Sequence, residues 1–512
     1  MTHQSEVRTS RFSKPGHGWS EVGRQLIDAA TTVAGRAPRD PLPVGAPDEV
    51  LASVARELGA PELPEAGIGE EAALRRMAHI VHEYGLNLTH ELCAAHLQPP
   101  PLSVAVAADA LASATNASLD TYDSGPATLA IETWTVQTLA RLAGLPSTAG
   151  GVFGPGGSYS NLLAMLIARD RAGASRGIDI RQHGVRALGS PVVLCSKVAH
   201  FSLQRACAAL GLGEQAVVTV DCDDEHRMVP AALEATLDAL VADDRTPVAV
   251  VATAGTTDFG TVDPLPEIAE IARRHGLWFH VDAAYGFGAL FSDRFAGLLR
   301  GIGDADSITL DLHKVGWQPA AASLLLLADT NSFASLDRSV AYLNPEDDLE
   351  AGFGGQLGLT LQTTRRPDVL KVATTLLAYG RDGLGSMLED CHNLAAHAQR
   401  RVESEPQLAL VSPATLTTVV FQYLCDEPDI DQVNAELRRR LISSGTALIG
   451  RTQVRVDAAD DQSRTCLKLT LLNPETSPAD IERLFDEILR VALEVESEGL
   501  APAALNVGVA HD

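Results

Sequence analysis

The sequence lacks the features that would direct it to a membrane, to a polyanionic partner or to an oxidising compartment. No apolar stretch reaches the ~18 residues of a membrane-spanning helix, and the N-terminal residues contain no apolar core of signal-peptide length. Basic residues are few, 40 against 66 acidic ones, and the formal charge of −26 argues against nucleic acid or an anionic membrane as a partner. The seven cysteines include no Cys-x-x-Cys pair. We therefore expect reduced packing cysteines in a cytoplasmic protein.

The length and the apolar content of the chain predict two or three domains. At 512 residues and 46% hydrophobic composition, the chain can build more than one core. We expect an N-terminal arm with docking helices over residues 1–100, a large domain over 101–375 and a small α+β domain over 376–512. The sequence shows no internal repeat and no low-complexity tract.

Two apolar segments, each followed by an ionisable side chain, are central to the sequence. Trp278–Val281 and Ser307–Leu310 suit buried strands, and they lead to Asp282 and Lys314. Both lie in a region, residues 191–327, where strand and helix patterns alternate as in a mostly parallel sheet with helices on both faces. Four further strands are predicted there: Val192–Cys195, Ala216–Val220, Val248–Thr253 and Ala322–Leu327.

Because α/β proteins bind ligands at the carboxyl ends of parallel strands, Asp282 and Lys314 can meet one ligand. Pyridoxal phosphate (PLP) requires such a pair: a lysine that holds it as a Schiff base, and an acid that keeps its pyridine nitrogen protonated. Taken singly, each residue has a simpler interpretation. An aspartate after a strand is usually a turn or cap residue, and a lone lysine is usually a solvated surface charge.

A glycine-rich turn provides a candidate phosphate site. Residues 150–161, Gly-Gly-Val-Phe-Gly-Pro-Gly-Gly-Ser-Tyr-Ser-Asn, open an apolar helix. The free backbone N–H groups at such a start, with the hydroxyl of Ser158, can hold an anion, although the spacing is neither a P-loop nor a dinucleotide fingerprint. Two more strand ends carry candidates: Thr253, and His200, which either stacks on a planar ring or begins a helix in solvent.

Outside the predicted sheet, two side chains have both a functional and a simple interpretation. His96 lies in a proline-rich loop, and it either orders that loop or lines a substrate pocket. Tyr342 lies in an irregular segment, residues 329–356, of the kind that often forms a lid or an interface loop. It is either a proton donor or an exposed loop tyrosine, and the sequence leaves both alternatives open.

Five motifs in a fixed order resemble the group II PLP-dependent amino-acid decarboxylases, which include glutamate, aromatic amino-acid and diaminobutyrate decarboxylases. They are Pro155-Gly-Gly-Ser-Tyr-Ser-Asn, Ala199-His-Phe-Ser, Ala252-Thr-Ala-Gly-Thr-Thr, His280-Val-Asp-Ala-Ala-Tyr and Asp311-Leu-His-Lys. Four other segments are similar to bacterial diaminobutyrate and lysine decarboxylases: His96-Leu-Gln-Pro-Pro, Tyr342-Leu-Asn-Pro-Glu-Asp-Asp, Thr363-Thr-Arg-Arg and Leu467-Lys-Leu-Thr-Leu-Leu-Asn-Pro. The resemblance implies an α/β protein of the aspartate-aminotransferase fold, fold type I. It also implies a homodimer with active sites at the interface.

By matching position, the resemblance assigns cofactor contacts. Lys314 would be the Schiff-base lysine, Asp282 the partner of the pyridine nitrogen, and His200 the side chain that stacks on the ring. Further contacts to the ring and the phosphate would come from Ala284, Thr253, Gly157, Ser158 and His313. The implied cofactor is PLP, and no metal is expected.

The resemblance also assigns residues to the substrate. Tyr342 would protonate the substrate carbon after CO2 leaves, Lys468 would lie near the substrate carboxylate, and His96 would line the pocket. Two places depart from the family pattern. One is the segment after the lysine, Val315-Gly316-Trp317-Gln318-Pro319, where close relatives tend to have bulkier residues ahead of Gln-Pro. The other is Phe287, which interrupts a usual Gly-Gly. Both would border the substrate pocket, so a changed substrate is expected.

The implied reaction is decarboxylation of an L-amino acid to its amine through a quinonoid intermediate. One alternative keeps the cofactor but cleaves a C–S bond, or oxidatively deaminates an S-cysteinyl conjugate, as some relatives in natural-product pathways do. A second alternative is a catalytically silent family member that acts as a binding subunit. The intact Lys314, Asp282 and His200 argue against the silent subunit.

Overall fold

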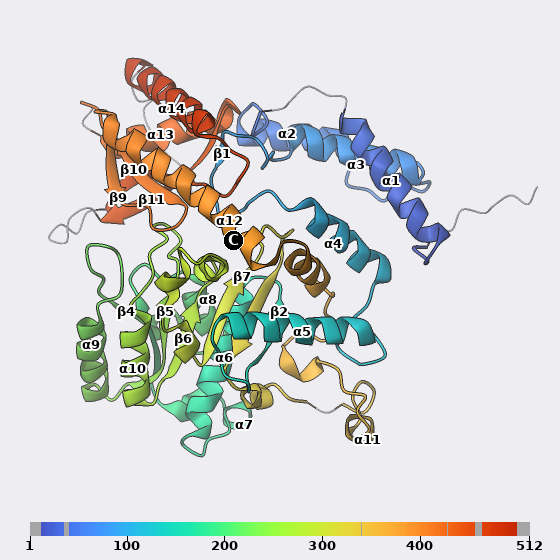
Figure 1. The fold of residues 1–512 in the computed structure, drawn as a ribbon, viewed down its shortest axis with the longest axis vertical. Helices are drawn as coiled ribbons and strands as arrows, with labels where there is room; N and C mark the ends of the chain where they lie inside the picture. The colour runs from blue at the N-terminus through green and yellow to red at the C-terminus, as the bar shows by residue number, and fades with distance from the viewer. Residues whose placement is uncertain (1–11, 35–39, 339, 427–428, 456–462, 499–512) are drawn as a thin grey trace, which may run out of the picture. The chain divides into compact units, whose positions relative to one another are not determined.

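The computed structural model describes residues 12–34, 40–338, 340–426, 429–455 and 463–498, which fall into two compact units (Figure 1). One unit contains residues 97–390 with the short segment Phe12–Lys14. The other contains the described residues of 15–96 and 391–498, so an early and a late part of the sequence share one unit. Each unit has its own sheet.

A seven-stranded sheet forms the centre of the unit of residues 97–390. Its strands lie in the order β2-β8-β7-β6-β5-β3-β4. Neighbouring strands from β4 to β7 are parallel, whereas β8 is antiparallel to both β7 and β2. The strands are β2 Gly150–Gly154, β3 Pro191–Ser196, β4 Val217–Val220, β5 Thr246–Thr253, β6 Trp278–Asp282, β7 Ser307–Asp311 and β8 Ser323–Leu327.

The middle strands of this sheet are buried throughout. Every residue of β3, β6 and β7 is buried, which requires covering layers on both faces. The predicted α/β class with a mostly parallel sheet is confirmed. One prediction was wrong in part: the first five residues of the expected glycine-rich turn, Gly150–Gly154, form β2, because they pair with β8.

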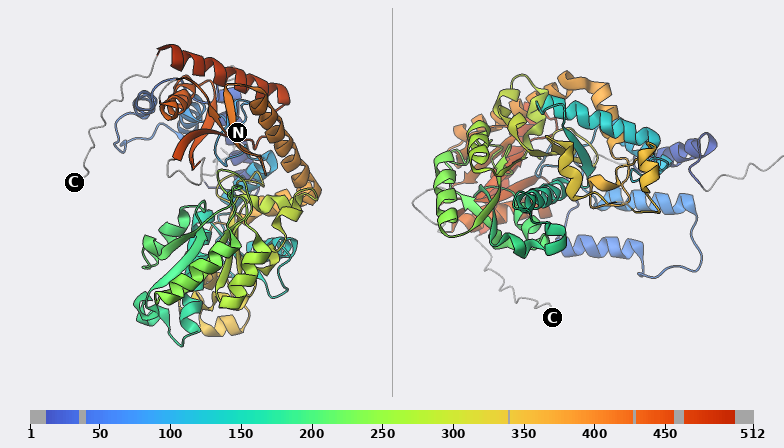
Figure 2. Two further views of the ribbon diagram at one scale, coloured as in Figure 1. Left: turned by 90° about the vertical axis from the view of Figure 1, so that its left-hand side faces the viewer. Right: turned by 90° about the horizontal axis from the view of Figure 1, so that it is seen from below.

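Helices cover both faces of the sheet (Figure 2). α6 (Gly157–Ala174) packs against β5 to β8, and α10 (Leu265–His275) packs against β5 and β6. The other helices of this unit are α4 Ser103–Thr115, α5 Pro126–Leu142, α7 Ile180–His183, α8 Ser202–Ala209, α9 Pro230–Ala242, α11 Glu346–Glu350 and the first part of α12 Val369–Ser404. Short 3-10 helices lie at Val185–Leu188, Glu214–Ala216, Gly286–Phe291, Ala296–Leu299, Ile302–Asp304, Thr330–Ser335 and Leu357–Leu359. No helix in the described residues is long and apolar enough to cross a membrane.

The second unit is built on a five-stranded sheet of order β1-β11-β12-β10-β9. Its strands are β1 Cys93–Ala94, β9 Leu408–Ser412, β10 Thr418–Tyr423, β11 Leu448–Arg455 and β12 Ser463–Thr470. Its helices are α1 His17–Ala34, α2 Pro47–Leu58, α3 Glu70–Tyr84, α13 Ile430–Ser443, α14 Pro478–Glu498 and the end of α12. The short strand β1 pairs in parallel with β11, which joins the early part of the chain to the late part.

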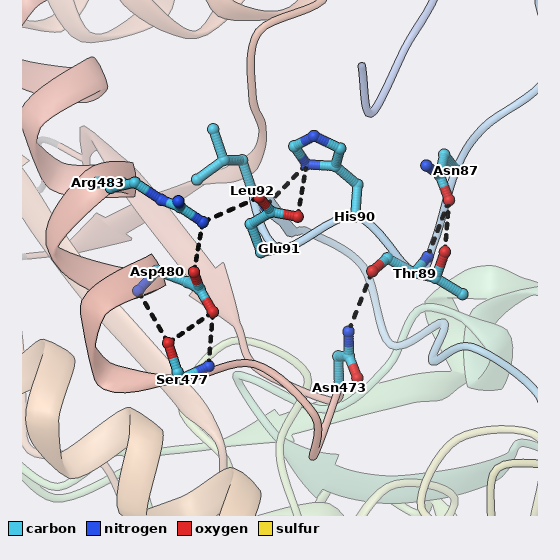
Figure 3. A network of polar contacts seen from close by, with 9 residues as sticks. All are labelled: Asn87, Thr89, His90, Glu91, Leu92, Asn473, Ser477, Asp480 and Arg483. Atoms are coloured by element: carbon cyan, nitrogen blue, oxygen red, sulfur yellow. Dashed lines mark hydrogen bonds and ion pairs between the residues drawn. The ribbon is translucent and has the colours of Figure 1, made fainter. Parts of the chain in front are cut away.

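Side-chain contacts also connect the segment before β1 to the region of α14 (Figure 3). Arg483 donates to Glu91 Oε1 at 2.9 Å and forms an ion pair with Asp480. Asn473 Nδ2 donates to the backbone oxygen of Thr89 at 3.5 Å. Because exposed ion pairs typically contribute ~0–1 kcal/mol each, this network orients the segment more than it stabilises the unit.

Candidate active site

Lys314 lies in the turn between β7 and β8, at the carboxyl end of β7. Its Nζ is 3.0 Å from Oδ2 of Asp311, the last residue of β7. His313 approaches the same oxygen with Nε2 at 3.7 Å, and its Nδ1 is 3.2 Å from the backbone oxygen of Ala322. The Asp311 side chain is 3% exposed, so these neighbours rather than water surround its charge.

The start of α6 lies against the same carboxylate. Gly156, with a φ of 142°, leads the chain into α6, and Gly157 is the first helical residue. A Cβ on Gly157 would come within 2.8 Å of Asp311 Oδ2, so only glycine allows this approach. The first N–H groups of a helix have no intrahelical acceptor, and those of Gly157 and Ser158 therefore offer two donors to an anion.

Asp282, at the end of β6, is buried and accepts two hydrogen bonds. Asn161 Nδ2 donates to its Oδ2 at 2.8 Å, and the backbone N–H of Ala284 donates to its Oδ1 at 3.1 Å. Asn161 lies on α6 about one turn after Gly157, so a single helix carries the anion donors and a partner of Asp282. Because β6 and β7 are parallel neighbours, Asp282 and Lys314 follow strands that end at the same edge of the sheet.

His200 precedes α8 and is connected to Asp282 through two side chains. Its Nδ1 is 2.9 Å from Ser202 Oγ, and this oxygen accepts from Asn161 Nδ2 at 2.9 Å. Burial lowers the pKa of His200 below its ordinary value, and the Asp282 carboxylate opposes this shift. Burial therefore favours a neutral imidazole at this position.

Thr253, the last residue of β5, pairs in register with Asp282. Its Oγ1 is buried and has no hydrogen-bond partner among the described residues. Its backbone N–H donates to Asp263 Oδ2 at 2.7 Å, and the N–H of Met228 donates to the other Asp263 oxygen at 2.7 Å. Burial raises the pKa of Asp263 to about 6. The end of β5 thus offers a fixed hydroxyl that can bind a ligand.

The predicted substrate and proton-transfer residues lie in different surroundings. Trp317 is 1% exposed and belongs to the core, whereas Tyr342 is 82% exposed. His96 and Lys468 belong to the other unit. There, burial lowers the pKa of His96, and the charges of Arg438 and Lys468 act in the same direction.

Asp311, Asn161 and Ser202 have no role predicted from the sequence, although each lies inside one of the five motifs. The spacing held a signal, since Asn161 is four residues after Gly157 and so had to share one face of a helix with it. The missing information was which strand that face would meet. Asn161 and Asp282 are 121 residues apart in sequence, and only the packing of α6 on the sheet brings them together.

The donor set fits PLP. Lys314 provides a primary amine, Asp282 a buried carboxylate, and the start of α6 two N–H groups for a phosphate. Thr253 Oγ1 and Asp311 Oδ1 are buried without a hydrogen-bond partner among the described residues, so polar groups remain to receive a ligand. No group of three or more side chains that could hold a metal ion occurs in the part of the chain that the structure describes.

Comparison with known proteins identifies relatives over most of the chain. A family model, the pyridoxal-dependent decarboxylase conserved domain, matches residues 68–424. L-2,4-diaminobutyrate decarboxylase of Rhizobium meliloti (strain 1021) is 40% identical over 442 residues, 86% of this chain and 86% of that protein. Cysteine sulfinic acid decarboxylase of Mus musculus is 32% identical over 447 residues, 83% of this chain and 87% of that protein.

A solved structure is similar over almost the whole chain. It is the glutamate decarboxylase domain of diaminobutyrate-pyruvate transaminase and L-2,4-diaminobutyrate decarboxylase from Vibrio parahaemolyticus, with a TM-score of 0.83 and 30% identity. The match covers 96% of this chain and 97% of the Vibrio parahaemolyticus chain. Fold type I, PLP as the cofactor and the carboxy-lyase class are thereby confirmed. The chain therefore belongs to the group II PLP-dependent amino-acid decarboxylases.

Proposed function

We propose that the protein removes CO2 from an L-amino acid, with Lys314 as the amine that holds the cofactor. The observation that carries this proposal is the convergence of Lys314, Asp311 and the start of α6, with Asp282 buried at the end of the neighbouring strand. When bound, PLP supplies an electron sink for the bond broken at the substrate α-carbon. The protein supplies binding, orientation and the handling of protons.

The residues of the site divide these tasks. Asp282 would face the ring nitrogen, with its carboxylate oriented by Asn161 and by the backbone N–H of Ala284. His200 would stack on the ring. The remaining contacts to the ring and the phosphate would come from Ala284, Thr253, Gly157, Ser158 and His313. The carboxylate of Asp311 holds the ammonium group of Lys314 at this edge of the sheet.

A diamino acid such as L-2,4-diaminobutyrate is the substrate that we propose. Support comes from the decarboxylases of Rhizobium meliloti and Acinetobacter baumannii, 40% and 33% identical, which are both named for this amino acid. Relatives named for cysteine sulfinic acid are 30–32% identical and make an acidic substrate the second candidate. Tyr342 would donate the proton that completes the amine, while His96 and Lys468 would contact the substrate. Trp317 is 1% exposed and would support the pocket from the core rather than touch the substrate.

Mass spectrometry of the products tests this proposal. Purified protein with PLP is incubated with L-2,4-diaminobutyrate, lysine, cysteine sulfinate, aromatic amino acids and S-conjugated cysteines. We expect the amine of a diamino acid, lighter than the substrate by CO2 alone. Aldehydes would instead indicate oxidative deamination, and thiols released from the conjugates would indicate cleavage of a C–S bond. Absence of every product, together with absence of the absorbance band that PLP gives when it is joined to a lysine, would indicate a silent subunit.

We further propose a cytoplasmic homodimer with active sites at the interface. Helix α2 contains no buried residue, and its Leu51 and Leu58 are 69% and 50% exposed. The 82% exposure of Tyr342 leaves its phenol open to a neighbouring subunit. None of the seven cysteines, all of which lie in the described residues, forms a disulfide, which suits a reducing compartment. Light scattering after size-exclusion chromatography would give twice the chain mass for a dimer.

A further inference from the structure

Behind Asp282 a row of buried polar side chains continues along β6. Side chains alternate between the two faces of a strand, so Trp278, His280 and Asp282 share one face. Trp278 Nε1 donates to Ser307 Oγ of β7 at 2.7 Å, and the same oxygen is 2.8 Å from His280 Nδ1. His280 and Ser307 are fully buried, so water cannot replace these contacts.

The row reaches Asp282 through α6. His280 Nε2 is 3.0 Å from Asn161 Oδ1, and Asn161 Nδ2 donates to Asp282 Oδ2 at 2.8 Å. We call Trp278, Ser307, His280, Asn161 and Asp282 the β6 chain. A branch leaves it at Asn161, whose Nδ2 also donates to Ser202 Oγ, and Ser202 contacts His200 Nδ1.

The direction of each hydrogen bond follows from the chemistry of its two ends. An indole N–H can only donate, and an ionised carboxylate can only accept. Asp282 therefore requires the amide nitrogen of Asn161, which turns Asn161 Oδ1 towards His280. His280 must then carry its proton on Nε2, and its Nδ1 accepts the Ser307 hydroxyl proton.

The reverse direction leaves a group without a partner. With Asp282 protonated and the Asn161 amide turned round, His280 would carry its proton on Nδ1 and donate to Ser307. The Ser307 oxygen would then accept from both His280 and Trp278, and its own proton would have no acceptor among the contacts described. A buried polar group without its hydrogen bond destabilises the fold, so the forward direction is favoured.

The same logic fixes His200. Because Ser202 Oγ accepts from Asn161, its proton is available to His200 Nδ1, and the backbone N–H of Ser202 points at the same nitrogen at 3.3 Å. His200 Nδ1 is therefore an acceptor, and its proton lies on Nε2. Burial lowers the pKa of His280 to about 4, which keeps that ring neutral as well.

We propose that the β6 chain holds Asp282 as the anion that the cofactor ring nitrogen needs and fixes His200 as its Nε2–H tautomer. The assignment rests on the proposed function, in which these two side chains contact the ring. Asn161, His280 and Ser307 act through Asp282 and are positioning residues.

The test compares Ser307→Ala with Thr309→Val. Ser307→Ala removes the donor to His280 Nδ1, so the imidazole proton is no longer confined to Nε2. Thr309→Val is the matched control, because it removes a buried hydroxyl 3.5 Å from His280 Nε2 that is not part of the β6 chain. Each apo-protein is titrated with PLP and with 1-deaza-PLP, an analogue without the ring nitrogen, and the dissociation constants are measured by equilibrium dialysis.

For Ser307→Ala we expect PLP binding to weaken about tenfold while 1-deaza-PLP binding changes less than twofold. For Thr309→Val both constants should remain within twofold. An equal loss for both cofactors would mean that Ser307 only supports the fold, and an unchanged PLP constant would mean that it does not act on Asp282. Either result overturns the proposal.

Nitrogen NMR of unmutated protein with 15N-labelled histidine gives a second, independent test. We expect His280 and His200 as neutral Nε2–H tautomers between pH 6 and 8, assigned with His280→Gln and His200→Gln. A proton on Nδ1 of His280 would overturn the proposal even if Ser307→Ala does not fold. The NMR test needs neither substrate nor cofactor. A failure of the proposed function would appear instead as absent PLP binding or absent products.

Discussion

Arg365 and Glu132 form a buried ion pair whose disruption should strongly destabilise the unit of residues 97–390. Arg365 Nη1 is 2.8 Å from Glu132 Oε1 and 3.2 Å from the backbone oxygen of Phe153 in β2. The two side chains are 4% and 0% exposed. Arg365→Met keeps much of the apolar volume but leaves a buried carboxylate without its counter-ion, which typically costs ~3–5 kcal/mol of the free energy of unfolding.

The loss of stability should depend on pH, because the Glu132 carboxylate becomes neutral when it binds a proton. Burial raises the pKa of Glu132 above its ordinary value, and the Arg365 guanidinium opposes this shift. Without Arg365, the folded protein binds a proton that the unfolded chain releases. The free energy of unfolding of Arg365→Met therefore falls as the pH rises from the ordinary carboxyl pKa of ~4.3 through the raised folded value. We expect a larger deficit at pH 8 than at pH 5.

Thermal unfolding of the apo-protein, followed by circular dichroism, measures this deficit. In a unit of this size a loss of ~1 kcal/mol in the free energy of unfolding lowers Tm by ~2 °C, so Arg365→Met should lower Tm by ~6–10 °C at pH 8. The control Arg273→Met breaks an exposed pair with Glu270, 74% and 47% exposed, and should shift Tm by less than ~2 °C. The double variant Arg365→Met/Glu132→Leu removes the buried charge and should recover much of the loss. A double variant no more stable than the single one would refute the reasoning.

Three further outcomes are expected. Tyr342→Phe should slow amine release and divert product to the aldehyde, since the phenol is the proposed proton donor; an unchanged amine-to-aldehyde ratio in mass spectrometry would contradict this role. Gly157→Ala should weaken PLP binding at least tenfold in equilibrium dialysis, because its Cβ would lie 2.8 Å from Asp311, whereas Gly297→Ala meets no atom within 4 Å and should bind normally. Asp263 has a folded pKa raised to about 6, so its contribution makes the free energy of unfolding fall by up to ~3 kcal/mol as the pH rises from ~4 to ~6. Calorimetry of Asp263→Asn should show that slope reduced, and an unchanged slope would rule out this carboxyl as its source.

The middle strands could be predicted because the sheet buries both of their faces. Such strands appear in the sequence as short continuous apolar runs, and the predicted β3 to β8 agree with the structure to within two residues at each end. Since neighbouring parallel strands end at one edge of the sheet, the location of Asp282 and Lys314 at the same edge followed from their places at the end of β6 and after β7. This part of the site depends on local pattern and chain order alone.

Strand β2 was not predicted because most of its residues are glycine. Gly150–Gly154 has low intrinsic strand propensity and resembles a turn, yet it pairs along its whole length with β8. The reason for glycine is close packing: a Cβ on Gly151 would lie 2.5 Å from the backbone oxygen of Leu325. Tertiary contact therefore decides a conformation that local sequence opposes.

The hydrogen bonds behind Asp282 were not predicted either, although the sequence contains a pattern that points to His280. His280 and Asp282 are two residues apart on one strand and so must share a face, which identifies His280 as a residue behind the acid. A buried histidine next to a functional carboxylate needs partners for both nitrogens. The sequence could not name them, because Ser307 and Asn161 are 27 and 119 residues away from His280 and meet it only through sheet register and helix packing.

Residues that serve only the cofactor cannot choose between substrates. The relatives named for diaminobutyrate and for cysteine sulfinic acid match most of this chain, although the side chains of these two amino acids carry opposite charges. In the proposed function, Asp282, Lys314 and the β6 chain act on the cofactor ring and on the substrate α-carbon, and every L-amino acid presents its α-carbon in the same way. Lys468 is proposed to lie near the α-carboxylate, which all amino acids share, so this contact does not distinguish one substrate side chain from another either. Discrimination between a cationic and an anionic substrate must therefore come from residues outside this set, and changes that alter the substrate should leave PLP affinity and the histidine tautomers unchanged.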